Sequence, residues 1–224
     1  MQNALNTNAS SKWVCVALND LRQLDGLHKT FSEAPYKQPP TQPVLYFKPR
    51  NTWSEDGATF PWPVENQLVV GASLAVMIGK TCRRVSAEQA LESVAGYRLL
   101  HDLSLPEQSY YRPDIKGKCL DHSAPISAQM VPVADVAAPN DLVVNTRVNG
   151  TLVSEQSIRQ LQRDINELVH SISHIMTLQP GDLIAVGFPG DRIVLQPSDQ
   201  LQSELVSTAG VQLTLNNRIG EASV

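Results

Sequence analysis

An Asn-Gly pair between two β-rich runs is the feature that most constrains the fold of this chain. The runs are residues 141–148 and 151–154, and Asn149-Gly150 lies between them. The pair favours a type I′ turn, because both central residues of that turn have positive φ and these two residue types tolerate it. The pattern therefore predicts an antiparallel hairpin, and with it a fold that contains a β-sheet.

Other apolar and β-branched runs predict further short strands and few helices. One helix is expected at 157–177, where apolar residues recur with helical spacing. Shorter helices are expected around 21–31 and at 86–93, the latter with Ser86 as N-cap and Gln89 at the capping-box position. The expected strands are 13–18, 44–48, 69–80, 96–102, 182–186, 201–206 and 211–215.

This order of elements has no alternating strand-helix period, so it predicts a mixed, β-rich α+β fold with one long helix. We expect a single domain over residues 13–224 and a disordered tail over the polar residues 1–12.

Composition argues against two classes of partner. A net charge of −4 and the absence of any long Lys/Arg run argue against nucleic-acid binding. No apolar run approaches the roughly 18–20 residues of a membrane span. Three widely spaced cysteines and a polar beginning predict a reduced, cytoplasmic protein without a signal peptide.

Six segments, in this order, resemble landmarks of the fumarylacetoacetate hydrolase family. The resemblance extends from about Trp13 to Ala222 and implies a β-sandwich roll with one long helix, assembled as a dimer or pseudo-dimer. Members of the family typically bind Mg²⁺, Mn²⁺ or Ca²⁺ and act on 2-oxo or enol acids. The segments are VLYFKPRNT, LAVMIGKTCRRVSAEQALESVAGYRLLHDLS, KGKCLDHSAPI, RVNGTLVSEQS, MTLQPGDLIAVGFPG and GVQLTLNNRIGEA.

Two segments are most similar to one branch of the family. They are VALNDLRQLDGLHKTFSEAPYKQPP and SLPEQSYYRPDIKGKC. The branch is the N-terminal half, or separate N-terminal-type subunit, of the isomerase/decarboxylases of 4-hydroxyphenylacetate catabolism. The resemblance implies a small dicarboxylic 2-oxo acid as substrate.

The family's metal site uses a Glu-x-Glu on a strand and a later Asp. Residues i and i+2 of a strand face the same side, so the two carboxylates converge on one hard cation. By the resemblance, the two Glu positions fall on Gly71 and Ser73, and only the aspartate is retained, as Asp102. The resemblance therefore predicts that this chain binds no metal of its own.

The other family positions differ in the same way. The family's histidine falls on Gln23, its arginine on Pro106 and its late threonine on Phe188. Lys118 matches the family's active-site lysine. Asp102 and Lys118 are the candidate catalytic residues, and we expect them to lie close together, because a carboxylate without its cation needs another counter-charge. Taken alone, Asp102 is more typical of a cap or turn aspartate at a strand end, and Lys118 of a solvated surface lysine; the resemblance is what makes them site candidates.

Three functions remain open. The first is a subunit or half without a metal site, paired with a second domain of the same fold that keeps Glu-x-Glu and holds Mg²⁺ or Mn²⁺. That partner is a second copy or a separate chain, so the assembly is a homodimer or heterodimer. The second is a metal-independent decarboxylase or tautomerase that uses Lys118 and Asp102. The third is a non-enzymatic module that binds a small acid.

Overall fold

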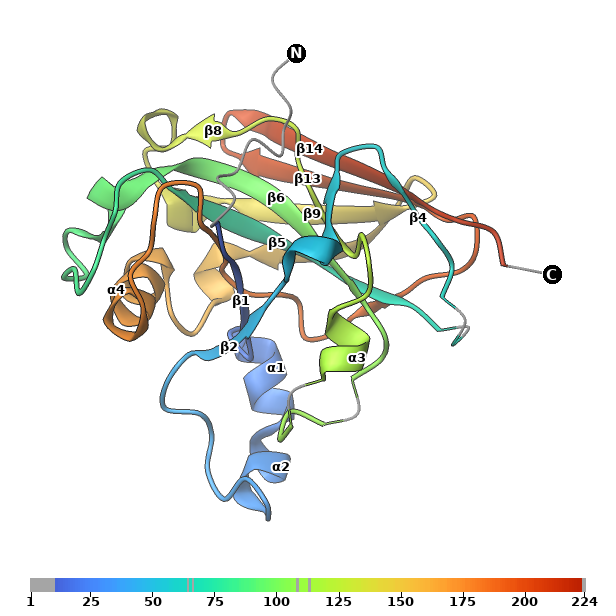
Figure 1. Cartoon of the computed structure of the whole chain (residues 1–224), viewed down its shortest axis with the longest axis horizontal. Coiled ribbons are helices and arrows are strands. Elements are labelled where there is room, and N and C mark those ends of the chain that lie inside the picture. The colour runs from blue at the N-terminus through green and yellow to red at the C-terminus, as the bar shows by residue number, and fades with distance from the viewer. Residues whose placement is uncertain (1–10, 64, 66, 108, 113, 223–224) are drawn as a thin grey trace.

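Strand β5 (Val69–Ile78) runs through the middle of the molecule, and the other elements are arranged around it (Figure 1). The structure is a computed structural model, described for residues 11–63, 65, 67–107, 109–112 and 114–222. Most of the expected tail, residues 1–10, lies outside the described residues. Lys12 is described, and its backbone N–H donates to the buried carboxylate of Asp182 at 2.7 Å.

In the described residues, β5 belongs to a nine-stranded mixed sheet with the order β2-β1-β11-β5-β6-β7-β3. β12 pairs with β5 and β8 pairs with β6 outside this order. The strands are β1 (Trp13–Ala17), β2 (Val44–Phe47), β3 (Trp53–Glu55), β6 (Val94–Ser104), β7 (Ala124–Ile126), β8 (Val131–Pro132), β11 (Leu183–Ala185) and β12 (Ile193–Val194).

A second sheet, five-stranded in the described residues, has the order β10-β9-β13-β14-β4. Asn149 and Gly150 join β9 to β10 with φ of 51° and 82°, so the predicted type I′ hairpin is confirmed. The strands are β4 (Thr59–Phe60), β9 (Val143–Val148), β10 (Thr151–Ser157), β13 (Gln200–Ser207) and β14 (Gly210–Ile219).

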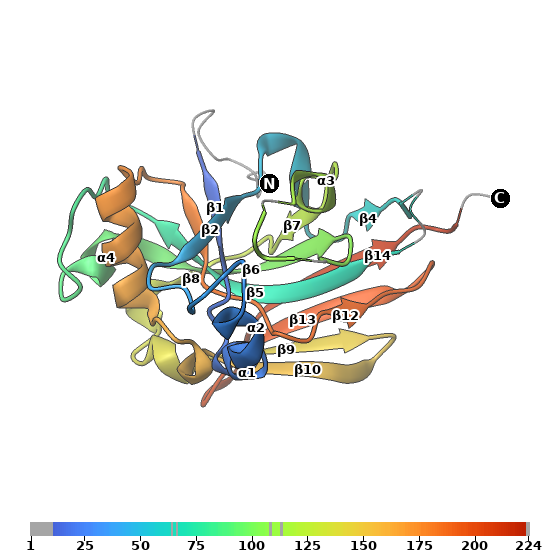
Figure 2. The same cartoon turned by 90° about the horizontal axis from the view of Figure 1, so that it is seen from below.

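The helices are short, and α4 stands at one end of the two sheets (Figure 2). They are α1 (Leu21–Gly26), α2 (His28–Ser32), α3 (Ile115–Lys118) and α4 (Ile165–Ile175), with 3-10 turns at Arg50–Thr52, Ala90–Ser93, Val133–Asp135, Pro139–Asp141 and Ile158–Gln160.

The prediction of a helix over 157–177 was wrong at its N-terminal end, because α4 begins only at Ile165. Asp164 caps it: its carboxylate accepts from the N–H of Glu167 at 2.9 Å, and the Glu167 carboxylate accepts from the N–H of Asp164 at 3.2 Å. Ile158 and Leu161 lie in and just after the 3-10 turn that precedes the helix, and their side chains are buried. Their apolar spacing therefore reflects burial in the core and not helical structure.

The helix expected at 86–93 was also wrong, because only Ala90–Ser93 form a 3-10 turn. Ser86 does not cap a helix; its carbonyl accepts from the N–H of Gln89 at 3.2 Å, as in a tight turn. β6 begins at Val94, directly after this segment, so the chain must already be extended where a further helical turn would lie.

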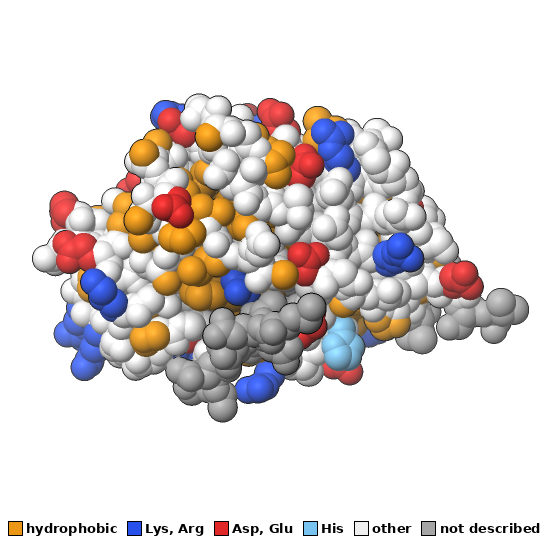
Figure 3. Space-filling model, turned by 90° about the horizontal axis from the view of Figure 1, so that it is seen from above, with side chains coloured by type: hydrophobic (Ala, Val, Ile, Leu, Met, Phe, Trp, Pro, Cys, Tyr) orange, Lys and Arg blue, Asp and Glu red, His pale blue; other side chains and the backbone are white. Residues whose placement is uncertain are grey.

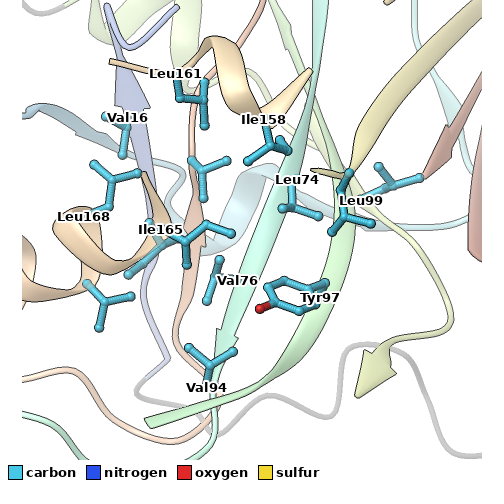
Figure 4. Close-up of a cluster of buried hydrophobic side chains, with 14 of the residues drawn as sticks. Val16, Leu74, Val76, Val94, Tyr97, Leu99, Ile158, Leu161, Ile165 and Leu168 are labelled. Carbon is cyan, nitrogen blue, oxygen red and sulfur yellow. The ribbon is translucent and has the colours of Figure 1, made fainter. Parts of the chain in front are cut away.

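The main hydrophobic core lies between the two sheets and α4 (Figure 4). β5 and β6 contribute to it from the large sheet, β13 and β14 from the small one, and α4 closes one end. The prediction of a mixed, sheet-rich α+β fold is confirmed. Core side chains drawn in Figure 4 include Val16, Leu74, Val76, Val94, Tyr97, Leu99, Ile158, Leu161, Ile165 and Leu168.

The surface carries charges of both signs. On the face seen in Figure 3, Lys/Arg and Asp/Glu side chains are interspersed, with apolar side chains between them. Among the helices of the described residues, none is long and apolar enough to cross a bilayer.

Candidate functional site

The side chain of Asp102 is the centre of a buried group of charges. It is fully buried on β6, and Asp102 is paired with Gly71 on the neighbouring strand β5. Three cations, here called the cation cluster, contact its carboxylate: Nζ of Lys48 at 2.7 Å, Nη2 of Arg192 at 3.1 Å and Nζ of Lys118 at 3.2 Å. Burial opposes the charge of Asp102, but the cluster outweighs this effect and holds the pKa of Asp102 well below its usual range.

Two members of the site come from the end of β2. The ammonium of Lys48 is fully buried and also donates to two backbone carbonyls and, at 3.1 Å, to the hydroxyl of Ser123. Two residues earlier, the hydroxyl of Tyr46 donates to Asp102 at 2.6 Å. Residues i and i+2 of an extended strand face the same side, so Tyr46 and Lys48 both point toward the carboxylate of Asp102. Burial, with the charge of Asp102, raises the pKa of Tyr46 well above its usual value.

Lys118 is delivered by the short helix α3. The carboxylate of Asp114 accepts from the N–H of Gly117 at 2.9 Å and so caps the helix. The side chain of Lys118 is 8% exposed, and its Nζ lies 3.6 Å from the carboxylate of Glu107. Burial raises the pKa of Glu107 although Lys118 and Arg192 oppose the shift.

A cavity of about 480 Å³, here called the Lys118 cavity, adjoins this lysine. Its walls are mainly apolar and come from β2, the segment before α3, and α3 itself. This volume is in the range of sites for small organic ligands. The residues used below are Leu45, Tyr46, Phe47, Glu107, Arg112, Ile115 and Lys118.

Arg192 occupies the space beside Gly71. β12 pairs with β5 through Ile193 and Val70, which brings Arg192 next to Gly71. A Cβ atom at position 71 would clash with Nη1 of Arg192 and lie 3.1 Å from its Cζ. The guanidinium also lies over the ring of Phe188, with Cζ 4.5 Å from the centroid.

Ser73, the second position on this side of β5, uses its hydroxyl internally. The hydroxyl donates to the carbonyl of Leu74 at 2.8 Å and accepts from the N–H of Gly187 at 3.4 Å. No group of three or more His, Cys, Asp or Glu able to hold a metal occurs in the described part of the chain. The three positions that correspond to the family's metal ligands do not fit a divalent cation, because Gly71 and Ser73 carry no charge and the carboxylate of Asp102 is already paired with three cations.

The structure thus brings together most of the residues that the sequence singled out. Asp102 and Lys118 are in contact, as expected, and Gly71 and Phe188 both border Arg192. The other two lie further out. Gln23 donates to the hydroxyl of Tyr110 at 2.8 Å, and that tyrosine lines the Lys118 cavity. Pro106 is exposed, and its side chain has no polar group.

Four functional candidates were missed by sequence reasoning: Tyr46, Lys48, Glu107 and Arg192. The i, i+2 spacing of Tyr46 and Lys48 in an expected strand is a signal that could have found them. Arg192 had no such signal, since its position depends on the pairing of two strands far apart in the sequence.

Comparison with known proteins agrees with this fold and with the resemblance. Residues 12–221 match the family model described as fumarylacetoacetate (FAA) hydrolase, C-terminal. The chain belongs to the fumarylacetoacetate hydrolase family. The family predicted from the sequence is therefore confirmed.

Among curated relatives, the 4-hydroxyphenylacetate degradation bifunctional isomerase/decarboxylase of Escherichia coli is 40% identical over 187 residues. The match covers 84% of this chain and 43% of the relative, in its N-terminal half. The chain thus spans less than half the length of that relative.

Solved structures of the family share the fold. The 5-carboxymethyl-2-hydroxymuconate delta-isomerase of Mycobacterium smegmatis superposes with a TM-score of 0.78 at 25% identity, covering 96% of this chain and 80% of that one. The fumarylpyruvate hydrolase of Pseudomonas aeruginosa, solved with Mn²⁺ and pyruvate, gives 0.78 at 22% identity and covers 94% and 90%. The latter likeness concerns the fold alone.

Proposed function

We propose that this chain is the metal-free half of an isomerase/decarboxylase assembly that acts on a small dicarboxylic 2-oxo acid. Its partner would be a second domain of the same family that holds Mg²⁺ or Mn²⁺. One observation carries the proposal: the only carboxylate at the expected metal position, Asp102, is neutralised by protein cations.

The reactions proposed for the assembly are isomerisation of 2-hydroxyhepta-2,4-diene-1,7-dioate and decarboxylation of 5-carboxymethyl-2-oxo-hex-3-ene-1,7-dioate. The name of the Escherichia coli relative, a bifunctional isomerase/decarboxylase, supports the two reaction types. Both pass negative charge onto the oxygen atoms of a 2-oxo acid, and a divalent cation in the partner would stabilise that charge. In this chain, Lys118 would bind a carboxylate of the acid, while Asp102 and Glu107 hold the ammonium at the cavity.

The test compares the chain alone with the chain mixed with a metal-holding domain of the family. We expect no turnover by the 24.5 kDa chain alone, no calorimetric signal with Mn²⁺, and a mixed species of higher mass by light scattering. Activity of the mixture above that of the partner alone supports the proposal. Micromolar Mn²⁺ binding by this chain, or a mixture that neither associates nor gains activity, contradicts it.

The second candidate function is a metal-independent decarboxylase or tautomerase. The position of Lys118 favours it, because a nearly buried ammonium beside an apolar cavity can stabilise an enolate. After it gives up a proton, the neutral amine could instead form a Schiff base with the 2-oxo group and release water. Turnover by the isolated chain in EDTA, lost in Lys118→Gln, would select this function. Binding of a small acid without turnover, alone and in the mixture, would select the non-enzymatic module.

A further inference from the structure

The charges around Asp102 do not balance. Lys48, Lys118 and Arg192 face two acids, Asp102 and Glu107, and Glu107 lies 3.6 Å from the nearest ammonium. A cation in a nearly dry site costs free energy unless an anion compensates it. A third carboxylate, that of Asp114, also lines the cavity, but it accepts from the N–H of Gly117 and, within the described part of the chain, forms no ion pair with the cluster. Among the ion pairs of the described residues, three cations thus share two carboxylates.

Lys118 is the cation that faces the cavity. Lys48 contacts the other oxygen of Asp102, Oδ1, and is fully buried with three further acceptors. Arg192 shares Oδ2 of Asp102 with Lys118 but does not line the cavity. Lys118 makes the longest of the three contacts with Asp102, at 3.2 Å. It is also the cluster member among the cavity walls.

The position of Arg192 is fixed by a strand register, a glycine and an aromatic ring. The register of β12 on β5 sets its backbone beside Gly71, the missing side chain of Gly71 leaves room for Nη1, and the ring of Phe188 supports the guanidinium. Two positions at which this chain differs from the family pattern, Gly71 and Phe188, thus accommodate one arginine. Nη1 is buried and has no hydrogen-bond acceptor among the described residues.

We propose that Arg192 replaces the divalent cation at Asp102, neutralises this carboxylate together with Lys48, and so leaves Lys118 free to bind a carboxylate in the Lys118 cavity without metal. The inference rests on the proposed absence of a metal site. Arg192 is then a positioning residue: it acts on the ligand through Asp102 and Lys118.

The cavity defines the class of ligand. Leu45, Phe47 and Ile115 suit an aliphatic body, and the nearly buried Lys118 suits one carboxylate. The exposed Arg112 also lines the cavity and suits a second carboxylate nearer to solvent. Glu107 lies in the same wall and disfavours more highly charged anions such as phosphate esters. The fitting ligand is an aliphatic acid with two carboxylates.

The first experiment is calorimetry with succinate, and with butyrate as the matched monocarboxylate, in buffer that contains EDTA. We expect the unmodified chain to bind succinate more tightly than butyrate. Arg192→Gln should weaken succinate binding at least about tenfold, since Asp102 then draws Lys118 away from the ligand. Arg192→Lys should retain most of the affinity, and Arg159→Gln, at a 69% exposed arginine paired with Asp141, should change nothing.

The second experiment separates this role from a merely structural one. In the double variant Asp102→Asn/Arg192→Gln, no acid at position 102 competes for Lys118, so succinate affinity should return toward that of the unmodified chain. Loss of packing around Arg192 would predict no recovery. Circular dichroism verifies that each variant is folded. If Arg192→Gln does not fold, the succinate affinities of Arg192→Lys and of the double variant are compared with that of the unmodified chain.

The outcomes distinguish this inference from the proposed function. Succinate binding that disappears in EDTA and returns with Mn²⁺ overturns both. Binding that EDTA does not affect and Arg192→Gln does not weaken overturns the role of Arg192 and leaves the metal-free half standing. Absence of succinate binding at millimolar concentration overturns the carboxylate site alone. EDTA-independent binding that falls in Arg192→Gln and recovers in the double variant supports the inference.

Discussion

The guanidinium of Arg192 lies where a side chain at position 71 would lie, and Gly71 leaves that space open. Gly71 is in a central strand, where glycine weakens the sheet unless another group needs close approach. The two residues therefore depend on each other. The guanidinium of Arg192 can reach Asp102 only because position 71 has no side chain, and the close approach of Arg192 explains a glycine in this strand.

The first prediction is that Gly71→Ala destabilises the protein. The added methyl group clashes with Nη1 of Arg192 and lies 3.2 Å from Cβ of Phe188, so the arginine must move away from Asp102. We expect a loss of about 1–3 kcal/mol in the free energy of unfolding, measured in urea. The matched control is Gly26→Ala, where nothing lies within 4 Å of the new Cβ atom. Equal stability of the two variants would contradict the contact.

The second prediction concerns Asp102→Asn. This change leaves the three cations of the cluster without their shared carboxylate, and breaking a buried ion pair from one side typically costs about 3–5 kcal/mol. We expect a loss of this order in the free energy of unfolding. Asp25→Asn, at an exposed position of α1, is the control and should stay within about 0.5 kcal/mol of the parent chain. A stable Asp102→Asn variant would mean that the cations do not depend on Asp102.

The third prediction is a pH dependence due to His101. Its ring is fully buried between Asn217 and Ser203, at 2.8 and 2.9 Å, and burial lowers the pKa of His101 to about 4. The unfolded chain binds the proton near its ordinary pKa of about 6.5, so acid favours unfolding. Above about pH 6.5, His101 is neutral in both states and does not reduce the free energy of unfolding. As the pH falls from about 6.5 toward 4, the unfolded chain takes up the proton first, and the free energy of unfolding falls by on the order of 3 kcal/mol.

Urea unfolding at pH 7, 6 and 5 measures this slope. His101→Gln keeps a polar side chain between the two partners but has no titratable group at this position, so its free energy of unfolding should fall less between pH 7 and pH 5 than that of the parent chain. An unchanged slope would assign the pH dependence to other groups.

The fold was predictable where local chemistry decides the structure. Asn149-Gly150 specified its turn by backbone conformation alone, so tertiary packing did not need to be known. The start of α4 was missed because Ile158 and Leu161 are core residues whatever their backbone conformation, and periodicity detects burial before it detects helix. The cap at Asp164, with Glu167 three residues later, was the better signal.

The site was predictable only in part, for a different reason. Resemblance to a family indicates the positions that the family uses, which led to Asp102 and Lys118. The resemblance offers no position for Arg192, because Arg192 matches none of the family's site residues that it indicated. Arg192 reaches Asp102 through strand pairing between β12 and β5, a contact between residues far apart in the sequence.

The last prediction is that a metal site can be built only when Arg192 is removed. Gly71→Glu/Ser73→Glu would add two carboxylates on one side of β5, next to Asp102, and period-2 spacing would aim them at one point. In this double variant, however, the guanidinium occupies the space of the first glutamate and pairs with the new acids. We therefore expect Mn²⁺ binding by calorimetry in Gly71→Glu/Ser73→Glu/Arg192→Ala, at least about tenfold tighter than in the double variant. Equal Mn²⁺ affinity of the two folded variants, or tight binding already in the double variant, would show that Arg192 does not occupy the cation position.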